Sequence, residues 1–238
     1  MINYAHRGAS EKAPENTMAA FYKAIEMGAN GIETDVQISS DNKLVLFHDD
    51  TMKRIIGIDR LISSFTYKEL LEFDFGAHKG AKYRNEKIVL LEDFLKYFSA
   101  KDITLAIEIK QNGLEQDVLS AINTFKCKER VIITSFDFEH LTCIRKLDKE
   151  ISLGFLTEDI NEETLKILEE NKVGQICPRV QNLTKEHVMN AKLKGFDVRG
   201  WDVKDTELMK HAIICGVDGM TVNFPDKLNE YIITGEFK

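Results

Sequence analysis

Long apolar runs are missing from this sequence of 238 residues. No stretch approaches the ~18 apolar residues that cross a membrane as a helix. Met1 is followed within a few residues by His6 and Arg7, without the basic region and apolar core of a leader segment. We therefore expect a cytoplasmic protein with no stable membrane insertion.

An excess of positive charge is also missing. Lys and Arg number 32 against 39 Asp and Glu, so the net charge is -7 at pH 7. Long-range repulsion of this sign opposes nucleic acid and anionic lipid, and neither is expected as a partner. A small anionic ligand would have to meet a few locally placed cations.

Cysteine is scarce, and no CxxC pair occurs. The four residues are Cys127, Cys143, Cys177 and Cys215, widely spaced and in apolar contexts. Their spacing argues against a zinc knot and a disulfide framework and predicts reduced thiols in the core. Because proline-rich linkers, low-complexity segments and internal repeats are lacking too, residues 1–238 are expected to form a single domain.

Short apolar runs of strand character alternate with segments of helical periodicity. Strands are expected at 2–6, 31–38, 103–110, 131–136, 151–156, 174–178, 196–201 and 218–223, and helices between them include 17–28, 91–100, 162–171 and 184–195. About eight such units predict an α/β fold, a (βα)8 TIM-type barrel, with an open doubly wound sheet as the alternative.

Two departures from this alternation follow the second strand. Residues 31–50 have the pattern of a β-hairpin with a turn at 40–43. From Thr51 to about Lys87 the chain then makes an insertion that contains five aromatic residues, Phe65, Tyr67, Phe73, Phe75 and Tyr83. Such an insertion is either a lid or binding loop, or a surface subdomain with a small core of its own.

Charged residues interrupt two of the expected strands. Glu33 and Asp35 share one strand face, as do Glu108 and Lys110 on another strand, because side chains two apart point the same way. Glu108 and Lys110 could neutralise each other, while the other pair meets solvent at the rim. Their joint position near the carboxyl ends of strands instead favours an active site with a hard cation, Mg²⁺ or Ca²⁺.

Two histidines are expected beside these carboxylates. If Asp41 and Asn42 form a two-residue turn, His48 lies opposite Asp35, and His6 ends the neighbouring first strand. Two imidazoles form a natural acid and base pair at neutral pH. With Arg7 and Lys110 as cations for phosphate oxygens, the set indicates cleavage of a phosphate ester.

These motifs resemble those of the glycerophosphodiester phosphodiesterase family. The matching segments are "HRG", "PENT", "ETDV", "LVLFHD", "EIK", "SF", "LTKEHV", a late "GW" and "GVDGMTVNFPD", in family order over nearly the full chain. The resemblance implies a barrel with an insertion after the second strand. It also implies hydrolysis of glycerophosphodiesters to sn-glycerol 3-phosphate and an alcohol, with the substrate's 2-hydroxyl attacking phosphorus.

Residue roles follow from the same resemblance. It assigns acid and base to His6 and His48, one divalent cation to Glu33, Asp35 and Glu108, the phosphate to Arg7 and Lys110, and a wall of the substrate site to Trp201. For Trp201, the sole tryptophan, filling of the core is the alternative. Asn16 and Ser135 match motif positions without an assigned role, and a helix cap or strand-end hydroxyl would explain either.

The chain departs from the family pattern at three places. Asp202, Val203 and Lys204 replace the usual Thr-Val-Asn after the tryptophan, "IVLLE" replaces Ile-Pro-Thr-Leu-Glu, and the last strand lacks a threonine at Val222. None of these changes removes a histidine or a carboxylate of the expected site, so activity is expected to survive. Asp202 adds a charge near the expected leaving alcohol and leaves the preferred diester open.

Two further functions compete with the diesterase. One is a silent barrel that binds phosphodiesters as a sensor or scaffold, which intact His6, His48 and Glu108 argue against. The other is a lipid-acting relative that cleaves lysophospholipids, with an acyl chain received by the phenylalanines of the insertion. Those rings would equally serve to pack the insertion.

Overall fold

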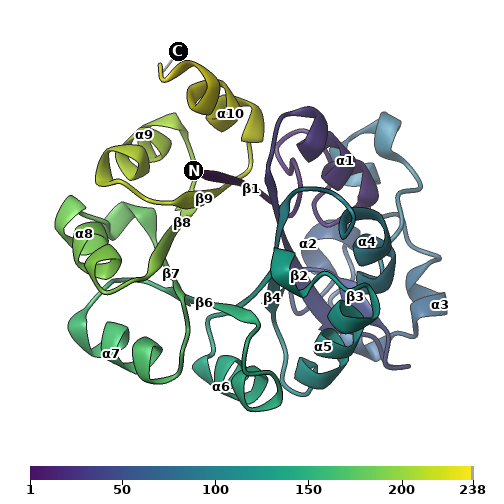
Figure 1. Ribbon diagram of the computed structural model, residues 1–238. Coiled ribbons are helices and arrows are strands. Elements are labelled where there is room, and N and C mark those ends of the chain that lie inside the picture. Colours follow the sequence, from purple (N-terminus) through teal and green to yellow (C-terminus); the bar gives the residue numbers. More distant parts are fainter. Residues whose placement is uncertain (237–238) are drawn as a thin grey trace.

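The computed structural model describes residues 1–236 of the chain. Eight parallel strands form a closed barrel (Figure 1), because β1 pairs with β2 on one side and with β9 on the other. The barrel strands are β1 (Ile2–His6), β2 (Gly31–Ile38), β4 (Thr104–Ile109), β5 (Val131–Ser135), β6 (Ser152–Thr157), β7 (Gln175–Pro178), β8 (Asp197–Val203) and β9 (Gly219–Val222). The TIM-type barrel is confirmed, and the open doubly wound sheet is ruled out.

Helices surround the barrel on its outside (Figure 1). They are α1 (Met18–Glu26), α4 (Leu91–Phe98), α5 (Glu115–Thr124), α6 (Phe138–Leu147), α7 (Glu162–Glu170), α8 (Lys185–Leu193), α9 (Thr206–Cys215) and α10 (Pro225–Thr234), with short 3-10 turns η4 (Lys128–Arg130) and η5 (Val180–Asn182). Side-chain oxygens of Thr17, Asn161, Thr184 and Asp205 accept an N–H of the first turn and so fix four helix starts. The helices expected from periodicity are all present.

Strand alternation separates an apolar outer face from a polar inner one. Ile32 and Leu105 are fully buried in the main hydrophobic core, which also contains residues of the surrounding helices. Glu33, Asp35 and Glu108 alternate with such residues and point toward the barrel axis. The predicted division of the two strand faces is therefore confirmed.

The hairpin after β2 is present, with a different turn. Strand β3 (Leu44–Leu46) pairs antiparallel with the end of β2. Ser39 N–H donates to Lys43 O at 2.9 Å, so the turn has three residues instead of two. Asn42 closes it with φ +58°, a left-handed conformation that suits the third residue of such turns.

The extra turn residue shifts the predicted register by one. Phe47 N–H donates to Asp35 O at 3.0 Å, so Phe47 is the residue opposite Asp35. The predicted pairing of His48 with Asp35 was therefore wrong. His48 follows β3 and lies outside the paired strands.

The insertion between β3 and α4 consists of short helical pieces. They are α2 (Lys53–Ile56), η1 (Ile62–Ser64), α3 (Tyr67–Leu70), η2 (Ala77–Lys79) and η3 (Ala81–Tyr83). Their apolar side chains form a cluster apart from the main core, in which Phe65 and Phe75 are 5% and 3% exposed. The insertion thus has a small core of its own, and these two rings are used to pack it.

Two predictions made from absences concern membranes and thiols. Within residues 1–236, no helix combines the length and apolar character needed to span a bilayer. All four cysteines are free, and Cys127, Cys177 and Cys215 are buried as expected, while Cys143 is partly exposed. Burial raises the thiol pKa of the three buried cysteines, so they are poor nucleophiles.

Candidate active site

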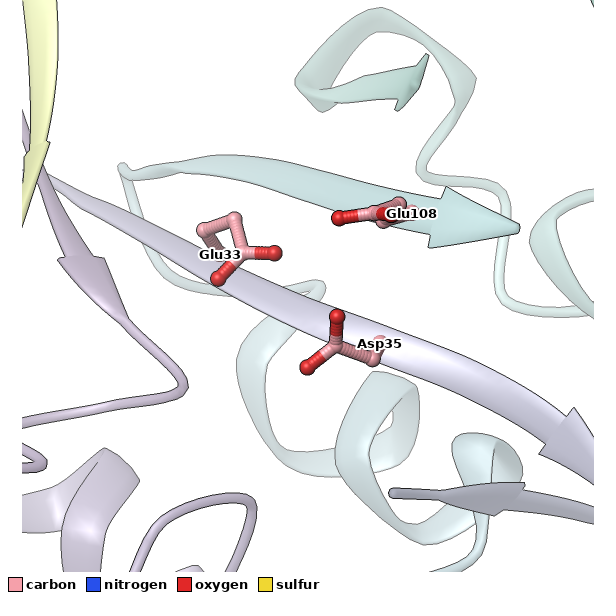
Figure 2. Close-up of side chains that lie close together, drawn as sticks. All are labelled: Glu33, Asp35 and Glu108. Atoms are coloured by element: carbon pink, nitrogen blue, oxygen red, sulfur yellow. The ribbon is translucent and has the colours of Figure 1, made fainter. Parts of the chain in front are cut away.

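Three carboxylates meet near the carboxyl ends of β2 and β4. Asp35 and Glu108 are direct neighbours in the parallel register, and Glu33 lies one inward position earlier on β2. Figure 2 shows the three side chains converging from the two strands. One oxygen of each lies within 4.8 Å of the others, and the residues are 4%, 0% and 7% exposed for Glu33, Asp35 and Glu108. They therefore do not meet solvent at the rim.

Burial and, after it, the charges of neighbouring side chains control the electrostatics of this cluster. Burial, with Asp35 and Glu108 nearby, raises the pKa of Glu33 to about 8, and burial also raises the pKa of Glu108. Burial opposes ionisation of Asp35 as well, but Arg7 and other cations nearby lower its pKa to about 2. A buried set of this kind is stabilised by additional positive charge.

The donor atoms suit a hard divalent cation. All three residues offer carboxylate oxygens, the ligands that Mg²⁺ and Ca²⁺ prefer. Among the described residues, Asp35 Oδ1 is buried without a hydrogen-bond donor, and Lys110 Nζ lies 3.7 Å from it. Its other oxygen accepts Asn16 Nδ2–H at 2.9 Å, which holds the carboxylate in place.

Arg7 and Lys110 add the expected cations beside the cluster. Lys110 Nζ donates to Glu108 Oε1 at 2.8 Å, so the ion pair considered from sequence does form. Arg7 follows β1 in a left-handed conformation, φ +56°, and its Nε lies 3.3 Å from Asp35 Oδ2. Its backbone N–H donates to Glu33 Oε2 at 3.1 Å. Strained backbone of this kind collects at functional sites.

His6 is oriented by the opposite end of the chain. Its Nδ1 lies 2.7 Å from Asn223 Oδ1, an oxygen that also accepts the hydroxyl of Ser10 at 2.9 Å. Because an amide oxygen only accepts, Nδ1 carries the proton and Nε2 keeps a free lone pair in the neutral ring. Nε2 lies 4.0 Å from Glu33 Oε2. Burial and the charge of Arg7 lower the pKa of His6, which favours this neutral form.

His48 has an equivalent arrangement on the other side. Its Nδ1 lies 2.7 Å from Asp49 Oδ1, which accepts the Nδ1 proton and leaves Nε2 free. His48 also lines the same cavity as His6, Glu33 and Glu108. The two histidines are thus brought to one site although the predicted strand register was wrong.

Trp201 forms a wall of that cavity, whose volume is about 190 Å³. Its indole N–H donates to Thr157 O at 3.0 Å, and the ring of Phe136 packs edge-on at 5.0 Å between centroids. The guanidinium of Arg179 lies 4.8 Å from the ring centroid. Trp201 is partly exposed, so it lines the site and does not fill the core.

Asp202, the departure next to Trp201, has its charge balanced. Its Oδ2 lies 3.0 Å from Arg179 Nε and 3.1 Å from Lys204 Nζ. Asp202 has φ +60° and lies between Gly200 and Val203, where the pairing of β8 with β9 shifts register. Asp202 thus lines the cavity. Because Arg179 and Lys204 balance its carboxylate, it does not add an isolated negative charge there.

Several site residues were not assigned a role from sequence. Asn16 accepts the hydroxyl of Thr34 at 2.8 Å and positions Asp35, while Thr17 caps α1. Ser135 Oγ donates to Ile109 O at 3.1 Å and is a strand-end hydroxyl. The motif matches had marked Asn16 and Ser135. Sequence alone could not show which residues they contact, and so gave them no role.

Arg199 is a further residue that sequence reasoning missed. It lines the cavity from β8, is 1% exposed and has its guanidinium carbon 5.0 Å from the ring centroid of Tyr4. Among the described residues, Nε and one terminal nitrogen of Arg199 have no hydrogen-bond acceptor. Its charge helps to lower the pKa of Glu33 against the larger effect of burial. No local pattern in β8 distinguished it from a surface arginine.

Comparison with known proteins identifies the family. The model of the glycerophosphoryl diester phosphodiesterase family matches residues 6–227. The chain belongs to this family. A glycerophosphodiester phosphodiesterase of Caldanaerobacter subterraneus is 34% identical over 236 residues, which cover 97% of each chain.

A solved structure agrees with the fold, and a further relative is similar in sequence. A solved phosphodiesterase of Oleispira antarctica, in complex with the product sn-glycerol-3-phosphate, is 28% identical and has a TM-score of 0.89 over 98% of this chain and 97% of its own. A human lysophospholipase D is 23% identical over 266 residues, covering 96% of this chain and 85% of its own. The prediction of a hydrolase of the phosphodiesterase class is confirmed at the level of the family.

Proposed function

We propose that this protein hydrolyses glycerophosphodiesters to sn-glycerol 3-phosphate and an alcohol in a metal-dependent reaction. The observation that carries the proposal is the joint position of two histidines and two buried carboxylates, Glu33 and Glu108, on one cavity beside Arg7. The bound product in the Oleispira antarctica relative supports the same substrate class. In this proposal the chain is one domain, with an insertion at about residues 51–87. Its substrate is a small molecule.

Glu33, Asp35 and Glu108 are the residues that would hold one divalent cation, Mg²⁺ or Ca²⁺. One oxygen of each lies within 4.8 Å of the others, and Asp35 Oδ1, which has no hydrogen-bond donor among the described residues, supports such a role. A bound cation would supply positive charge for a phosphoryl oxygen. Burial and the neighbouring charges of Asp35 and Glu108 raise the pKa of Glu33, an effect that a bound cation would oppose.

His6 and His48 would provide the acid and the base. Each donates its Nδ1 proton to a fixed oxygen, Asn223 Oδ1 or Asp49 Oδ1, so each presents Nε2 for proton transfer. One accepts the proton of the substrate's 2-hydroxyl as this oxygen bonds to phosphorus. The other, protonated, gives a proton to the departing alcohol oxygen as its bond to phosphorus breaks. Water then opens the cyclic phosphate with the two roles reversed.

Arg7 and Lys110 would bind the phosphate, and Trp201 would pack against the substrate. Both cations already touch the carboxylate cluster, at 3.3 Å for Arg7 Nε to Asp35 and 2.8 Å for Lys110 Nζ to Glu108. They therefore place positive charge where negative charge develops on the phosphoryl oxygens. Holding the 2-hydroxyl next to phosphorus also gives the attack the advantage of an intramolecular reaction.

The test measures release of sn-glycerol 3-phosphate by chelator-stripped protein, with ³¹P NMR as the means of detection. Glycerophosphocholine and glycerophosphoethanolamine are supplied with Mg²⁺ or Ca²⁺, and lysophosphatidylcholine is run in parallel. Release from the deacylated diesters with one metal supports the proposal and identifies the cation. Binding without turnover would instead identify a silent barrel, and cleavage confined to the lysophospholipid would identify a lipid-acting enzyme.

A further inference from the structure

Arg54 of the insertion bridges two carboxylates at the edge of the site. Its terminal nitrogens donate to both oxygens of Glu15, each at 2.7 Å. On its other side Nε donates to Asp49 Oδ2 at 2.7 Å, and a terminal nitrogen donates to Asp49 Oδ1 at 3.1 Å. Four of the five N–H donors of the guanidinium are thus used, two on each carboxylate.

Each of these carboxylates holds a residue of the proposed reaction. Glu15 Oε1 accepts from Arg7 at 2.9 Å, and Asp49 Oδ1 accepts from Nδ1 of His48 at 2.7 Å. Arg54 is thus linked through Glu15 to Arg7, a proposed phosphate-binding cation, and through Asp49 to His48, a proposed catalytic histidine. Of the described residues, those that line the cavity include Arg7 and His48 but not Arg54.

Both carboxylates are charged at neutral pH. Burial opposes ionisation of Glu15, but hydrogen bonds from Arg54 and the charge of Arg7 lower its pKa to about 2. Arg54 and His48 likewise lower the pKa of Asp49 against the effect of burial. Without the guanidinium, Glu15 would keep its contact with Arg7 and Asp49 its contact with His48, but each carboxylate would lose two hydrogen bonds that fix its orientation.

The insertion fixes the position of Arg54. Arg54 lies on α2, which starts after the fully buried Met52 and ends before Gly57, a residue with φ +85°. Ile55 and Ile56, its neighbours on this short helix, pack against the core of the insertion. The small hydrophobic cluster of the insertion therefore determines where the charged fork reaches the barrel.

We propose that Arg54 is a positioning residue that sets Arg7 through Glu15 and His48 through Asp49. This role rests on the proposed function, because it assumes that Arg7 and His48 act on the substrate. The insertion would then contribute to the active site through Arg54, whereas its buried aromatic residues only pack its core. Lysine cannot replace the arginine, since an ammonium group offers no planar fork to two carboxylates.

The first experiment compares Arg54→Met and Arg54→Lys with wild type. We expect kcat to fall about 10- to 100-fold in both, as for other residues that orient a functional side chain through a hydrogen bond. KM should change less than kcat, because Arg7 keeps its contact with Asp35. Lys53→Met is the control, since Lys53 is on the same helix and pairs at 2.8 Å with the exposed Asp59.

The second experiment observes the His48 ring directly by ¹⁵N NMR, with His48→Gln used for assignment. Wild type should show the Nδ1–H tautomer in the neutral ring, and Arg54→Met should populate both tautomers. Asp49→Asn provides a second variant if Arg54→Met folds poorly. In the double variant Asp49→Asn/Arg54→Lys, kcat should fall by less than the product of the two single losses, because both act on His48.

The outcomes separate this role from its alternatives. A kcat within twofold of wild type with an unchanged His48 tautomer would overturn the positioning role, as would a rise of KM alone, which indicates direct contact with substrate. If the wild-type protein releases no glycerol 3-phosphate, the proposed function fails. The tautomer measurement still decides whether Arg54 orients His48.

Discussion

One hydrogen bond between His6 and Asn223 links the first and the last strand of the barrel at their carboxyl ends. His6 closes β1, Asn223 directly follows β9, and the donor and acceptor are 2.7 Å apart across 217 residues of sequence. The amide oxygen accepts the Nδ1 proton, so the bond selects the tautomer that leaves Nε2 free. The pairing of β1 with β9 that closes the barrel is thus also what orients one of the proposed catalytic groups.

Removing this acceptor should impair turnover more than stability. We expect Asn223→Ala to lower kcat about 10- to 100-fold, because the ring of His6 loses its fixed tautomer. Asn223→Asp should retain more activity, since a carboxylate still accepts from Nδ1. Steady-state kinetics at constant metal concentration is the measurement, with Asn190→Ala on α8 as the control. Equal activity of Asn223→Ala and wild type would disprove the orienting role.

The histidines themselves should show larger effects. His6→Ala and His48→Ala are each expected to lower kcat by about 10²- to 10⁴-fold, the usual range for general acid or base catalysis. Both variants should remain folded by circular dichroism, because the two side chains are about one-third exposed, at 33% and 31%. His187→Ala on α8 serves as the control. Near-normal rates in both site variants would refute the acid-base assignment.

The barrel and its carboxylates were predictable because both arise from short-range patterns. Strand length and helical periodicity repeat along the chain, and the two-residue spacing of Glu33 and Asp35 assigns them to one face. The shared edge of a parallel barrel then brings Glu108 to the same place. These inferences need the order of the strands, which the regular alternation supplies.

The partners of the site residues could not be predicted in the same way. The hairpin register depended on a turn that has three residues instead of two, of which the third, Asn42, is left-handed. Arg54 reaches Glu15 and Asp49 only because the insertion has its own core. Asn223 stood in a recognised motif, but its partner His6 depends on barrel closure.

Acid should weaken the contacts that Asp148 makes. Asp148 lies between α6 and β6 and accepts the N–H groups of Glu150 and Ile151, at 2.8 and 3.0 Å, with Lys128 Nζ 2.8 Å away. Burial opposes ionisation, but these contacts lower the pKa of Asp148 to about 2 from 3.8. The stabilisation is therefore complete above pH 3.8 and is lost as pH falls through about 2.

Substitution of Asp148 tests this pH dependence. At pH 7, Asp148→Asn should lower the free energy of unfolding by about 1 kcal/mol, less than the full pKa difference because solvent screens the group. The difference from wild type should shrink as pH falls toward 2, measured by urea unfolding at each pH. Asp102→Asn, at a fully exposed side chain, should show little change at any pH. A constant difference across the range would contradict the linkage.

The carboxylate cluster should trade stability for metal binding. Glu33→Gln removes one of three crowded negative charges, while its amide oxygen can still accept the backbone N–H of Arg7. We expect the metal-free variant to unfold at the same temperature as wild type or a higher one, because a buried carboxylate with a raised pKa is unfavourable to ionise. Loss of a ligand should at the same time weaken Mg²⁺ or Ca²⁺ binding by about tenfold or more.

Calorimetry separates these two effects. Thermal unfolding in excess chelator gives the stability of the metal-free protein, and isothermal titration with each cation gives the affinity. Glu139→Gln on α6 is the control, because its side chain is exposed and should change neither quantity. Since ligand binding raises apparent stability by mass action, added metal should stabilise wild type more than the variant and make wild type the more stable protein. Metal affinity equal to that of wild type in Glu33→Gln would exclude Glu33 as a ligand.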